Sequence, residues 1–241
     1  MKRYAIIPAR YGSTRFPGKA LATLFGKPII RHVYEKVVES ALFDEVFIAT
    51  DDERIRQAAE GFEAKIVLTD PSLPSGTDRC AVAAKELELT GLIVNVQGDE
   101  PLIESTALEA LCKAFEDPEV KMASLMTQLL NKADYHNPNV VKVVVDKLSN
   151  AMYFSRSLIP FNRDNDSRMR YFRHVGVYAF HHDLLQEFVA LPLGYYENIE
   201  KLEQLRALEN GIKIRMVETN YQGIGVDTPQ DLEAITIKMG S

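Results

Sequence analysis

The stretch YAIIPARYGSTRFPGK, residues 4–19, decides the fold of this chain. It begins with an apolar run at 4–8 that ends in proline, which predicts a short buried strand. A loop rich in Gly, Pro and Arg follows over 9–19, and apolar residues at helical spacing predict a helix over 28–40. The apolar run EVFIAT at 45–50 predicts a second strand. Strand, helix and strand in this order are typical of a parallel α/β sheet.

The same alternation continues to about residue 109. The expected elements are a short helix that Asp51 caps and that ends near Gly61, a strand over 65–68, a loop over 71–76, a helix from Thr77 or Asp78 to about Leu89, a strand over 92–97, and a helix that the capping box Thr106…Glu109 opens. This order predicts an α/β fold with a mainly parallel sheet and helices on both of its faces.

The second half of the chain has a different pattern. Strand-like pieces with few helical signals between them predict an antiparallel excursion from the main sheet, and they lie at 121–130, 140–146, 151–155 and 173–180. Further expected elements are helices over 183–191 and 198–210, the second stopped by Gly211, a strand over 213–218, and a last helix capped by Thr228. Because no repeat or low-complexity linker interrupts the chain, we expect a single domain over 1–241 with a strand-rich subregion at about 121–182.

Charge is distributed unevenly along the chain. The 241 residues are 46% hydrophobic and 26% charged, as in an ordinary soluble globular protein, and the net charge of −6 disfavours nucleic-acid binding. Residues 1–34, however, contain seven basic residues and no acidic one. We therefore expect the first part of the chain to bind a small anion.

Targeting signals and metal-binding patterns are not recognisable in the sequence. The first apolar stretch ends at Arg10, too early for a secretory signal, and no apolar run is long enough to span or insert into a membrane. Cys80 and Cys112 match neither a redox nor a zinc pattern, so we expect both to be small core residues in a reducing cytoplasm. His181 and His182 are adjacent, so their side chains should point in different directions, and a histidine metal site is not expected.

The basic loop is the first candidate binding site. Arg10, Arg15 and Lys19 lie in it together with Gly12 and Gly18, whose backbone amides can approach phosphate oxygens closely. The spacing is not that of a P-loop, because five residues separate the glycines and alanine follows the lysine. A solvated basic loop is the alternative, but three cations without an acid at a strand-to-helix junction favour phosphate binding.

Two aspartates are candidate metal ligands. Asp99 follows the strand over 92–97, in an acidic turn, and should emerge at the same sheet edge as the basic loop. Mg²⁺ suits such oxygen ligands together with substrate phosphates, although an ordinary turn explains the residue equally well. Asp227 precedes the cap Thr228 and could complement the helix dipole or supply a second carboxylate. The metal-ligand interpretation of Asp99 and Asp227 becomes stronger if both side chains face the phosphate loop.

Two further groups could recognise the rest of a substrate. The segment SGTDR at 75–79 offers N–H groups and hydroxyls to a base or ribose, or could simply cap a helix. A basic cluster would suit a substrate carboxylate, with scattered surface arginines as the alternative; it comprises Arg156, Arg163, Arg168, Arg170, Arg173 and His174. For Arg168 and Arg170 we prefer the surface interpretation.

Over essentially its whole length the chain resembles the 3-deoxy-manno-octulosonate (Kdo) cytidylyltransferases, or CMP-Kdo synthetases. The resemblance is carried, in the same order, by IIPARYGSTRFPGK, IATDD, SGTDR, NVQGDEP, NPNVVKVVVD, YFSRSLIP, RHVGVYAF, ENIEKLEQLRALENG and GVDTPQDLE. It implies a Rossmann-like nucleotidyltransferase fold and a homodimer joined through the strand-rich region. It also implies a Mg²⁺-dependent reaction for lipopolysaccharide biosynthesis, in which CTP and the sugar acid give the CMP-sugar and pyrophosphate.

The resemblance also implies roles for individual residues. Arg10, Ser13, Arg15 and Lys19 would hold the triphosphate, Ser75, Gly76, Thr77 and Arg79 would surround the cytidine, Gln97 would bridge nucleotide and sugar, Asp99 and Asp227 would ligate Mg²⁺, and Arg156, His174, Tyr178, Glu203 and Gln204 would bind the sugar acid. The catalytic set would be Lys19, Arg10, Asp99 and Asp227.

The chain departs from the family pattern in its sugar-binding half. It has Tyr196, Glu197 and Asn198 where the family commonly has Leu-Glu-His, and His181 where an arginine commonly follows the strand. These departures leave the sugar open between Kdo and a close analogue such as its 8-amino-8-deoxy form.

Three other functions are less favoured. A CMP-sialic acid synthetase or another sugar nucleotidyltransferase would share the chemistry, but the matching blocks extend through the sugar-binding segments. A protein that binds CTP without turnover would lack Lys19 or one of the carboxylates Asp99 and Asp227, and all three are present. A dehydrogenase would need the glycine fingerprint that is missing here.

Overall fold

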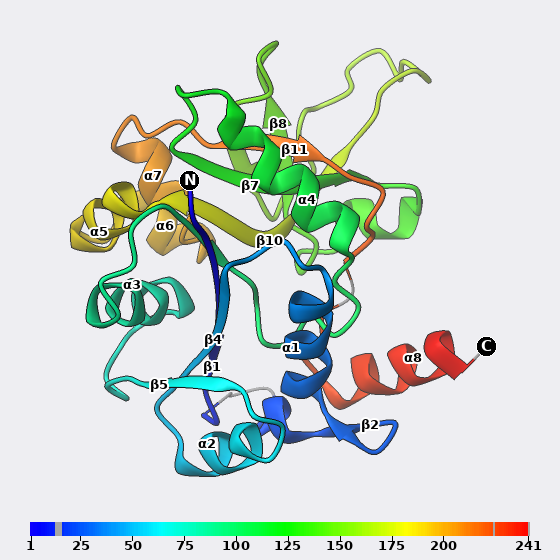
Figure 1. Ribbon diagram of the computed structural model, residues 1–241. Helices are drawn as coiled ribbons and strands as arrows, with labels where there is room; N and C mark the ends of the chain where they lie inside the picture. Colours follow the sequence, from blue (N-terminus) through cyan, green and yellow to red (C-terminus); the bar gives the residue numbers. More distant parts are fainter. Residues whose placement is uncertain (13–15, 224, 241) are drawn as a thin grey trace. The chain divides into compact units, whose positions relative to one another are not determined.

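The chain folds into two compact units. The computed structural model describes residues 1–12, 16–223 and 225–240 (Figure 1). The first unit comprises Met1–Glu109 and Gly223–Ser241, and the second comprises Ala110–Gln222. Compactness alone does not decide between one elaborated domain and two, so the single-domain assignment stays a prediction.

The first unit is built on four parallel strands in the order β5-β4-β1-β6. Their bounds are β1 Arg3–Ala9, β4 Glu45–Thr50, β5 Lys65–Leu68 and β6 Leu92–Asn95. All residues of β1 after its first are buried, as are all four of β6. Strands buried on both faces need apolar residues throughout, which explains the uninterrupted apolar runs in the sequence.

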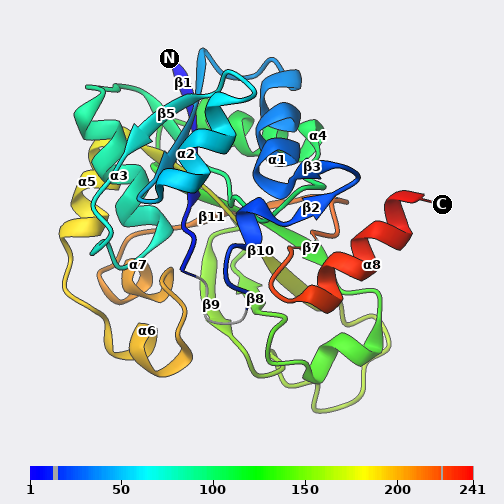
Figure 2. The ribbon, with the colours of Figure 1, turned by 90° about the horizontal axis from the view of Figure 1, so that it is seen from below.

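Helices cover both sides of these strands, which confirms the predicted α/β arrangement. The first unit contains α1 Ile29–Glu39, α2 Glu53–Glu60, α3 Gly76–Glu86 and α8 Pro229–Gly240, with η1 Lys19–Leu21 and a small hairpin of β2 Thr23–Leu24 and β3 Lys27–Pro28. Helix α4 (Ser105–Lys113) includes the boundary between the two units. Figures 1 and 2 show α1 and α3 on opposite sides of β1 and β4. Helix α1 buries Ile29, Val33 and Val37, which are four residues apart and therefore share one face.

The last helix belongs to the first unit through its apolar face. Ile235 of α8 and Val226 just before it pack with Leu24 and Ile29 in one buried cluster. This cluster holds the segment before α8 against the hairpin and α1, although more than 180 residues separate the two parts in the sequence.

Mixed and antiparallel pairing characterises the second unit, as predicted. Strand β10 (Phe172–His181) pairs antiparallel with β7 (Met122–Gln128) and β8 (Lys142–Val145), and β8 pairs antiparallel with β9 (Ala151–Ser155). Strand β11 (Arg215–Glu218) instead runs parallel to its neighbour β7. A β-bulge interrupts β10 between Val175 and Tyr178, and the Ser124 hydroxyl donates to the carbonyl oxygens of Val175 and Val177 there.

The predicted helix over 198–210 is wrong, because the structure has two shorter helices there. These are α6 (Tyr195–Glu200) and α7 (Leu205–Glu209), and they follow α5 (His182–Ala190). Lys201 ends α6 with a left-handed backbone, φ 53°, which no α-helix can contain. Gly211, at φ +74°, follows α7 and is the stop that its sequence position predicted. The short helices η2 (Ala114–Glu116) and η3 (Lys132–His136) complete the unit.

Three predicted helix starts need correction by one or two residues. Asp52, rather than Asp51, caps α2, because its carboxylate accepts from the Arg54 backbone N–H at 2.9 Å. Ser75 caps α3, and its hydroxyl accepts from the backbone N–H groups of Thr77 and Asp78 at 3.1 Å each. Helix α4 begins at Ser105, so Thr106 lies inside it and is not the cap.

The predicted cap Thr228 is confirmed. Its hydroxyl accepts from the Asp231 backbone N–H at 3.2 Å, and the Asp231 carboxylate accepts from the Thr228 N–H at 2.8 Å. This reciprocal pair fixes the start of α8.

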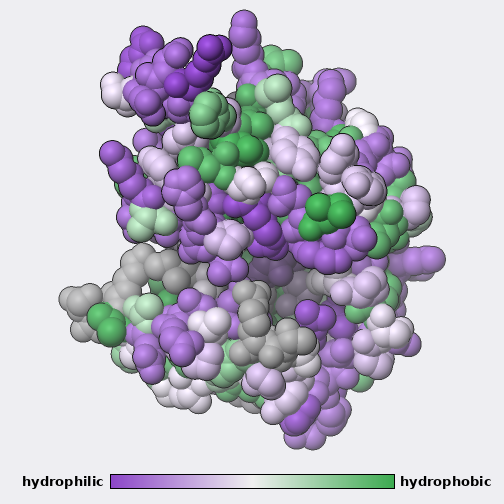
Figure 3. Space-filling model, turned by 180° about the vertical axis from the view of Figure 1, so that it is seen from behind, coloured by the Kyte–Doolittle hydropathy of each residue, from purple (hydrophilic) through white to green (hydrophobic). Residues whose placement is uncertain are grey.

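Other sequence expectations concern the core and the surface. Cys80 and Cys112 are both buried, as predicted, and neither forms a disulfide bond. Hydrophilic side chains dominate the face seen in Figure 3. Within the described ranges, every helix is too short or too polar to cross a bilayer.

Candidate functional site

A cleft opens in the first unit at the carboxyl ends of β1 and β6. Its volume is about 350 Å³, and its lining comes from segments far apart in the sequence. The lining includes Arg10, Lys19, Ser75, Gly76, Arg79, Gln97, Asp99 and Asp227, all of which the sequence singled out. Ligands of open parallel sheets bind at this edge, so the position of the cleft agrees with the fold.

Lys19 lies between the two candidate metal carboxylates. Its ammonium donates to Asp227 Oδ1 at 3.0 Å and makes a short contact with Asp99 Oδ2. Burial alone would lower the pKa of Lys19, but the neighbouring Asp99 and Asp227 carboxylates outweigh it and raise the pKa. The lysine is therefore held in its charged form, as a phosphate-binding group must be.

Local backbone geometry brings these three side chains together. Gly18, at φ +72°, turns the basic loop into η1, in a region of backbone space that favours glycine. A side chain at Gly98 would have its Cβ 2.8 Å from the Pro8 carbonyl oxygen, so only glycine lets the turn after β6 lie against the end of β1. The Val226 N–H donates to the Asp99 carbonyl at 2.8 Å, which ties the segment carrying Asp227 to this turn.

Arg79 forms a buried ion pair at the cleft wall. Its guanidinium donates to Asp51 Oδ2 at 3.0 Å and makes a short hydrogen bond with the Thr69 hydroxyl, and its side chain is only 3% exposed. Asp51 had not been assigned a role at the site from its sequence. Its position directly after β4, at the carboxyl edge of the sheet, was the signal that could have identified it.

The α3 start supplies the next part of the wall. Gly76 packs against the Pro8 ring, since an added Cβ would lie 3.1 Å from Pro8 Cγ. Gln97 lines the cleft beside it and donates to Asn95 Oδ1 at 3.2 Å. The Thr77 hydroxyl is buried and accepts from Asn95 Nδ2 at 3.2 Å, so its side chain faces β6. The nucleotide-binding roles of Gly76, Thr77 and Gln97 stay predictions.

The basic loop is only partly described. Arg10 follows β1 directly, is exposed, and lines the cleft, so its guanidinium can reach an anion there. Ser13 and Arg15, which are also predicted to bind the triphosphate, lie outside the described residues.

The predicted sugar-binding residues other than Gln97 belong to the second unit, where most of them cluster. The His174 ring lies 5.1 Å from the Phe154 ring and 5.3 Å from the Tyr178 ring, and its Nε2 is 2.8 Å from the Ser124 hydroxyl. Gln204 approaches the other ring nitrogen at 3.5 Å. This enclosure lowers the pKa of His174 to about 3, with the Arg173 charge adding to the effect. His174 is therefore neutral at physiological pH and offers hydrogen bonds, not charge.

The Tyr178 hydroxyl is buried and lies within the influence of the Glu203 carboxylate. Burial raises the pKa of the Tyr178 hydroxyl, and the Glu203 carboxylate raises it further. Tyr178 is thus a neutral hydrogen-bonding group as well.

Arg156 is held by backbone carbonyls. Its guanidinium donates to the carbonyl oxygens of Glu200 at 2.7 Å, Pro138 at 2.8 Å and Lys201 at 3.2 Å. The same Glu200 accepts from the Arg156 N–H through its carboxylate at 3.0 Å. Arg156 therefore fixes the end of α6, and its assignment to a substrate carboxylate stays a prediction.

Lys142 is a second buried cation, and it was not among the residues predicted from the sequence. Lys142 is fully buried and donates to the carbonyl oxygens of Asn137 and Val140 at 2.8 Å and of Arg156 at 2.9 Å. Burial lowers its pKa. The sequence signal for this buried lysine was its place inside the apolar strand pattern VVKVVV. A lysine in such a strand is buried, and a buried ammonium needs several acceptors.

The donor set of Asp99 and Asp227 fits a hard divalent cation. Both carboxylates converge on one cationic group, the Lys19 ammonium, and both keep solvent access, with side chains 23% and 44% exposed. Two carboxylates beside a cationic loop match what Mg²⁺ uses in nucleotide sites. Asp99 and Asp227 are the residues that would hold such an ion.

Together, the parallel sheet and the cleft at its carboxyl edge are typical of nucleotide-binding α/β proteins. A family model described as "Cytidylyltransferase" matches residues 4–214, and the chain belongs to this family. The family resemblance and the fold class expected from the sequence are thus confirmed.

Individual relatives agree with this assignment. The chain is 49% identical to a protein of Geobacter sulfurreducens named 3-deoxy-manno-octulosonate cytidylyltransferase, over 98% of both chains. It is also 49% identical to a protein of Shewanella sp. (strain W3-18-1) named 8-amino-3,8-dideoxy-manno-octulosonate cytidylyltransferase, over 94% of both chains. A solved structure described as CMP:2-keto-3-deoxy-manno-octonic acid synthetase complexed with CTP matches with a TM-score of 0.94 at 43% identity. That match covers 100% of this chain and 99% of the other.

Proposed function

We propose that this chain transfers CMP from CTP to the anomeric hydroxyl of Kdo, or of its 8-amino-8-deoxy analogue, and releases pyrophosphate. The activated sugar would serve lipopolysaccharide biosynthesis. The observation that carries the proposal is the cleft in which Lys19, Asp99 and Asp227 converge, in a chain 43% identical to a synthetase whose structure contains CTP.

The reaction needs positioning and charge neutralisation more than acid–base chemistry. The sugar hydroxyl attacks the α-phosphorus and gives up its proton to water, the P–O bond to the β-phosphate breaks in line with the attack, and the electron pair leaves with pyrophosphate. Arg10 and Lys19 would bind the phosphate oxygens, where negative charge grows. Ser75, Gly76 and Arg79 line the same cleft and would contact the cytidine.

Mg²⁺ is part of the proposal, with Asp99 and Asp227 as its ligands. The chemistry that Mg²⁺ supplies when bound is neutralisation of the phosphate charge. Lys19 contacts both carboxylates, so its ammonium and a divalent cation would compete for the same oxygens. Lys19 would then turn from the carboxylates to the phosphates when CTP binds.

Two sugars, Kdo and its 8-amino-8-deoxy analogue, are candidates for the acceptor. Relatives at 49% identity carry the Kdo name and the 8-amino name alike. The pKa values of His174 and Tyr178 favour neutral hydrogen bonds to sugar hydroxyls over an ion pair with the sugar carboxylate.

Assembly and compartment complete the proposal. We propose a homodimer formed through the strand-rich region, where Leu148, Met152 and Phe161 have side chains 69%, 64% and 88% exposed. Light scattering during size exclusion should give twice the 27.1 kDa chain mass, and a mass of one chain at micromolar concentration would contradict it. Two buried cysteines that form no disulfide bond support a reducing cytoplasm as the compartment.

Pyrophosphate release tests the proposed activity. Release should require CTP, Mg²⁺ and an eight-carbon 3-deoxy sugar acid together, and Kdo, its 8-amino analogue and sialic acid should be compared at equal concentration. Release with sialic acid alone would replace the sugar assignment, and no release with any of the three would overturn the transferase proposal.

A further inference from the structure

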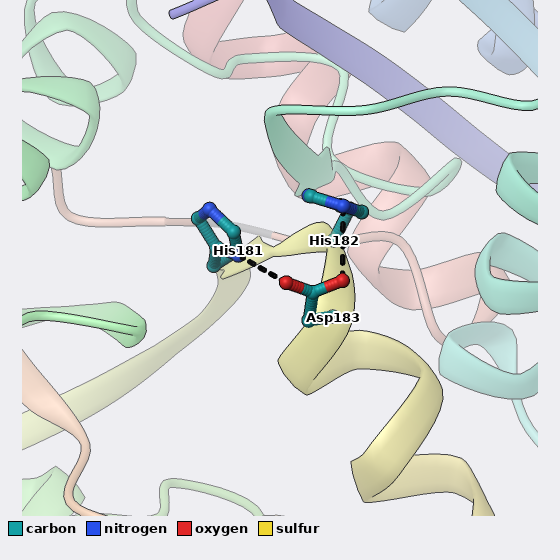
Figure 4. A group of neighbouring side chains, drawn as sticks. All are labelled: His181, His182 and Asp183. Carbon is teal, nitrogen blue, oxygen red and sulfur yellow. Dashed lines mark ion pairs between the residues drawn. The ribbon is translucent and has the colours of Figure 1, made fainter.

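Two histidines and an aspartate converge at the junction of β10 and α5. His181 is the last residue of β10, and His182 and Asp183 are the first two residues of α5. Figure 4 shows the two rings directed toward the Asp183 carboxylate. The expectation that adjacent histidines diverge is wrong here, because the chain changes from extended to helical between them.

The distances match those of a transition-metal site. His181 Nδ1 is 3.6 Å from Asp183 Oδ2, and His182 Nε2 is 2.9 Å from Asp183 Oδ1 (Figure 4). One ligand atom from each residue lies within 4.8 Å of the other two. Tetrahedral Zn²⁺ with bonds of about 2.0–2.1 Å holds its ligand atoms roughly 3.3 Å apart. Small side-chain rotations would therefore bring the three atoms to one ion.

The charges around the cluster also permit a cation. The start of α5 presents the positive end of the helix dipole, which by itself disfavours a metal ion. Asp183 supplies a negative charge there, which opposes both the helix dipole and the Lys121 charge that acts on His181. The side chains of His181 and His182 are 27% and 28% exposed, and that of Asp183 is 78% exposed, so an ion can enter from solvent and keep a water ligand.

We propose that His181, His182 and Asp183 form a binding site for a divalent transition-metal ion, zinc foremost. Two imidazole nitrogens and one carboxylate oxygen favour Zn²⁺, Co²⁺ or Ni²⁺ over Mg²⁺, which takes oxygen ligands. The site differs in chemistry from the all-oxygen pair Asp99 and Asp227. A bound ion ties the end of β10 to the first turn of α5 and stabilises this junction.

Titration of the full chain with Zn²⁺ at about pH 7.5, with excess Mg²⁺ present to occupy oxygen sites, tests the proposal. The wild type should bind one equivalent, and Co²⁺ in its place should give the visible absorption of a tetrahedral site. His182→Gln and Asp183→Asn should each weaken Zn²⁺ binding by more than about tenfold. His136→Gln, a matched change elsewhere in the second unit, should leave it unchanged.

Thermal unfolding provides the second measurement. Zn²⁺ should raise the Tm of the wild type and of His136→Gln, but not that of His182→Gln, whose metal-free Tm shows whether it folds. The proposal fails if the wild type binds no Zn²⁺ at about 100 µM, or if His182→Gln and Asp183→Asn bind it as tightly as the wild type.

Discussion

At the scale of single residues, the cleft depends on charges that neutralise one another. Lys19 meets Asp99 and Asp227, which lie 80 and 208 positions away in the sequence, and Arg79 meets Asp51. Each ion pair holds a cation where a nucleotide would need it. The Asp99 and Asp227 carboxylates thus hold the Lys19 ammonium in place, and under the proposed function the same oxygens would bind Mg²⁺.

The buried pair of Asp51 and Arg79 gives the first prediction. Asp51→Asn removes the charge partner of a guanidinium that is only 3% exposed. We expect the free energy of unfolding to fall by about 3 kcal/mol, because an uncompensated buried charge is costly. Chemical denaturation measures the change.

A matched variant controls for the loss of any aspartate charge. Asp166→Asn breaks the pair with Arg168, whose side chain is 88% exposed, and should cost less than about 1 kcal/mol. Equal losses of unfolding free energy in the two variants would show that the Asp51–Arg79 pair stabilises the fold no more than an exposed pair does.

His174 gives a prediction about pH. Its pKa is about 3 in the folded chain and about 6.5 when unfolded, so below pH 6.5 the unfolded state binds one more proton than the folded state. Stability should fall as pH drops from about 6.5 toward 3, by about 1.4 kcal/mol per pH unit from this group, with no contribution above pH 6.5. In His174→Gln this part of the slope should vanish. Denaturation at several pH values measures it, and identical slopes for the two proteins would contradict the assignment.

At the scale of elements, the break between α6 and α7 depends on Lys201. Its φ of 53° is strained for a residue with a side chain, so Lys201→Gly should be neutral or stabilise the fold by up to about 1 kcal/mol. Lys85→Gly, within α3, should instead destabilise by about 1 kcal/mol. Thermal or urea unfolding compares the two, and a loss at Lys201 as large as at Lys85 would contradict the left-handed conformation.

At the scale of the whole molecule, the sequence predicted what is periodic or local. Apolar runs predicted the strands of the first unit. The helix cap at Thr228 and the helix stop at Gly211 were also predictable, because each acts on neighbouring residues. The break between α6 and α7 at Lys201 could not be predicted in this way. No glycine or proline stands there, and the break depends on tertiary contacts. The role of Asp51 depends on Arg79, which lies in another segment, and no spacing in the chain predicts this pair. Lys142 has two of its carbonyl acceptors nearby, at Asn137 and Val140, but only the folded chain turns them and the Arg156 carbonyl toward its ammonium.

The sequence predicted which residues form the candidate site but not which of their side chains contact one another. Arg10, Lys19, Asp99 and Asp227 were each weak signals, and the fold brings all four to one cleft. That Lys19 contacts both carboxylates follows from backbone contacts such as that between Val226 and Asp99, which only the folded chain provides.

The central claim is that this cleft carries out the transfer, and one measurement tests it most directly. Pyrophosphate release from CTP and the preferred sugar acid should be compared for Asp99→Asn, Asp227→Asn, the exposed control Asp164→Asn and the wild type, at saturating Mg²⁺. We predict losses in kcat of about 10²-fold or more for the first two variants, with unchanged melting, and a wild-type rate for the control. Near-normal rates for Asp99→Asn and Asp227→Asn would contradict the account.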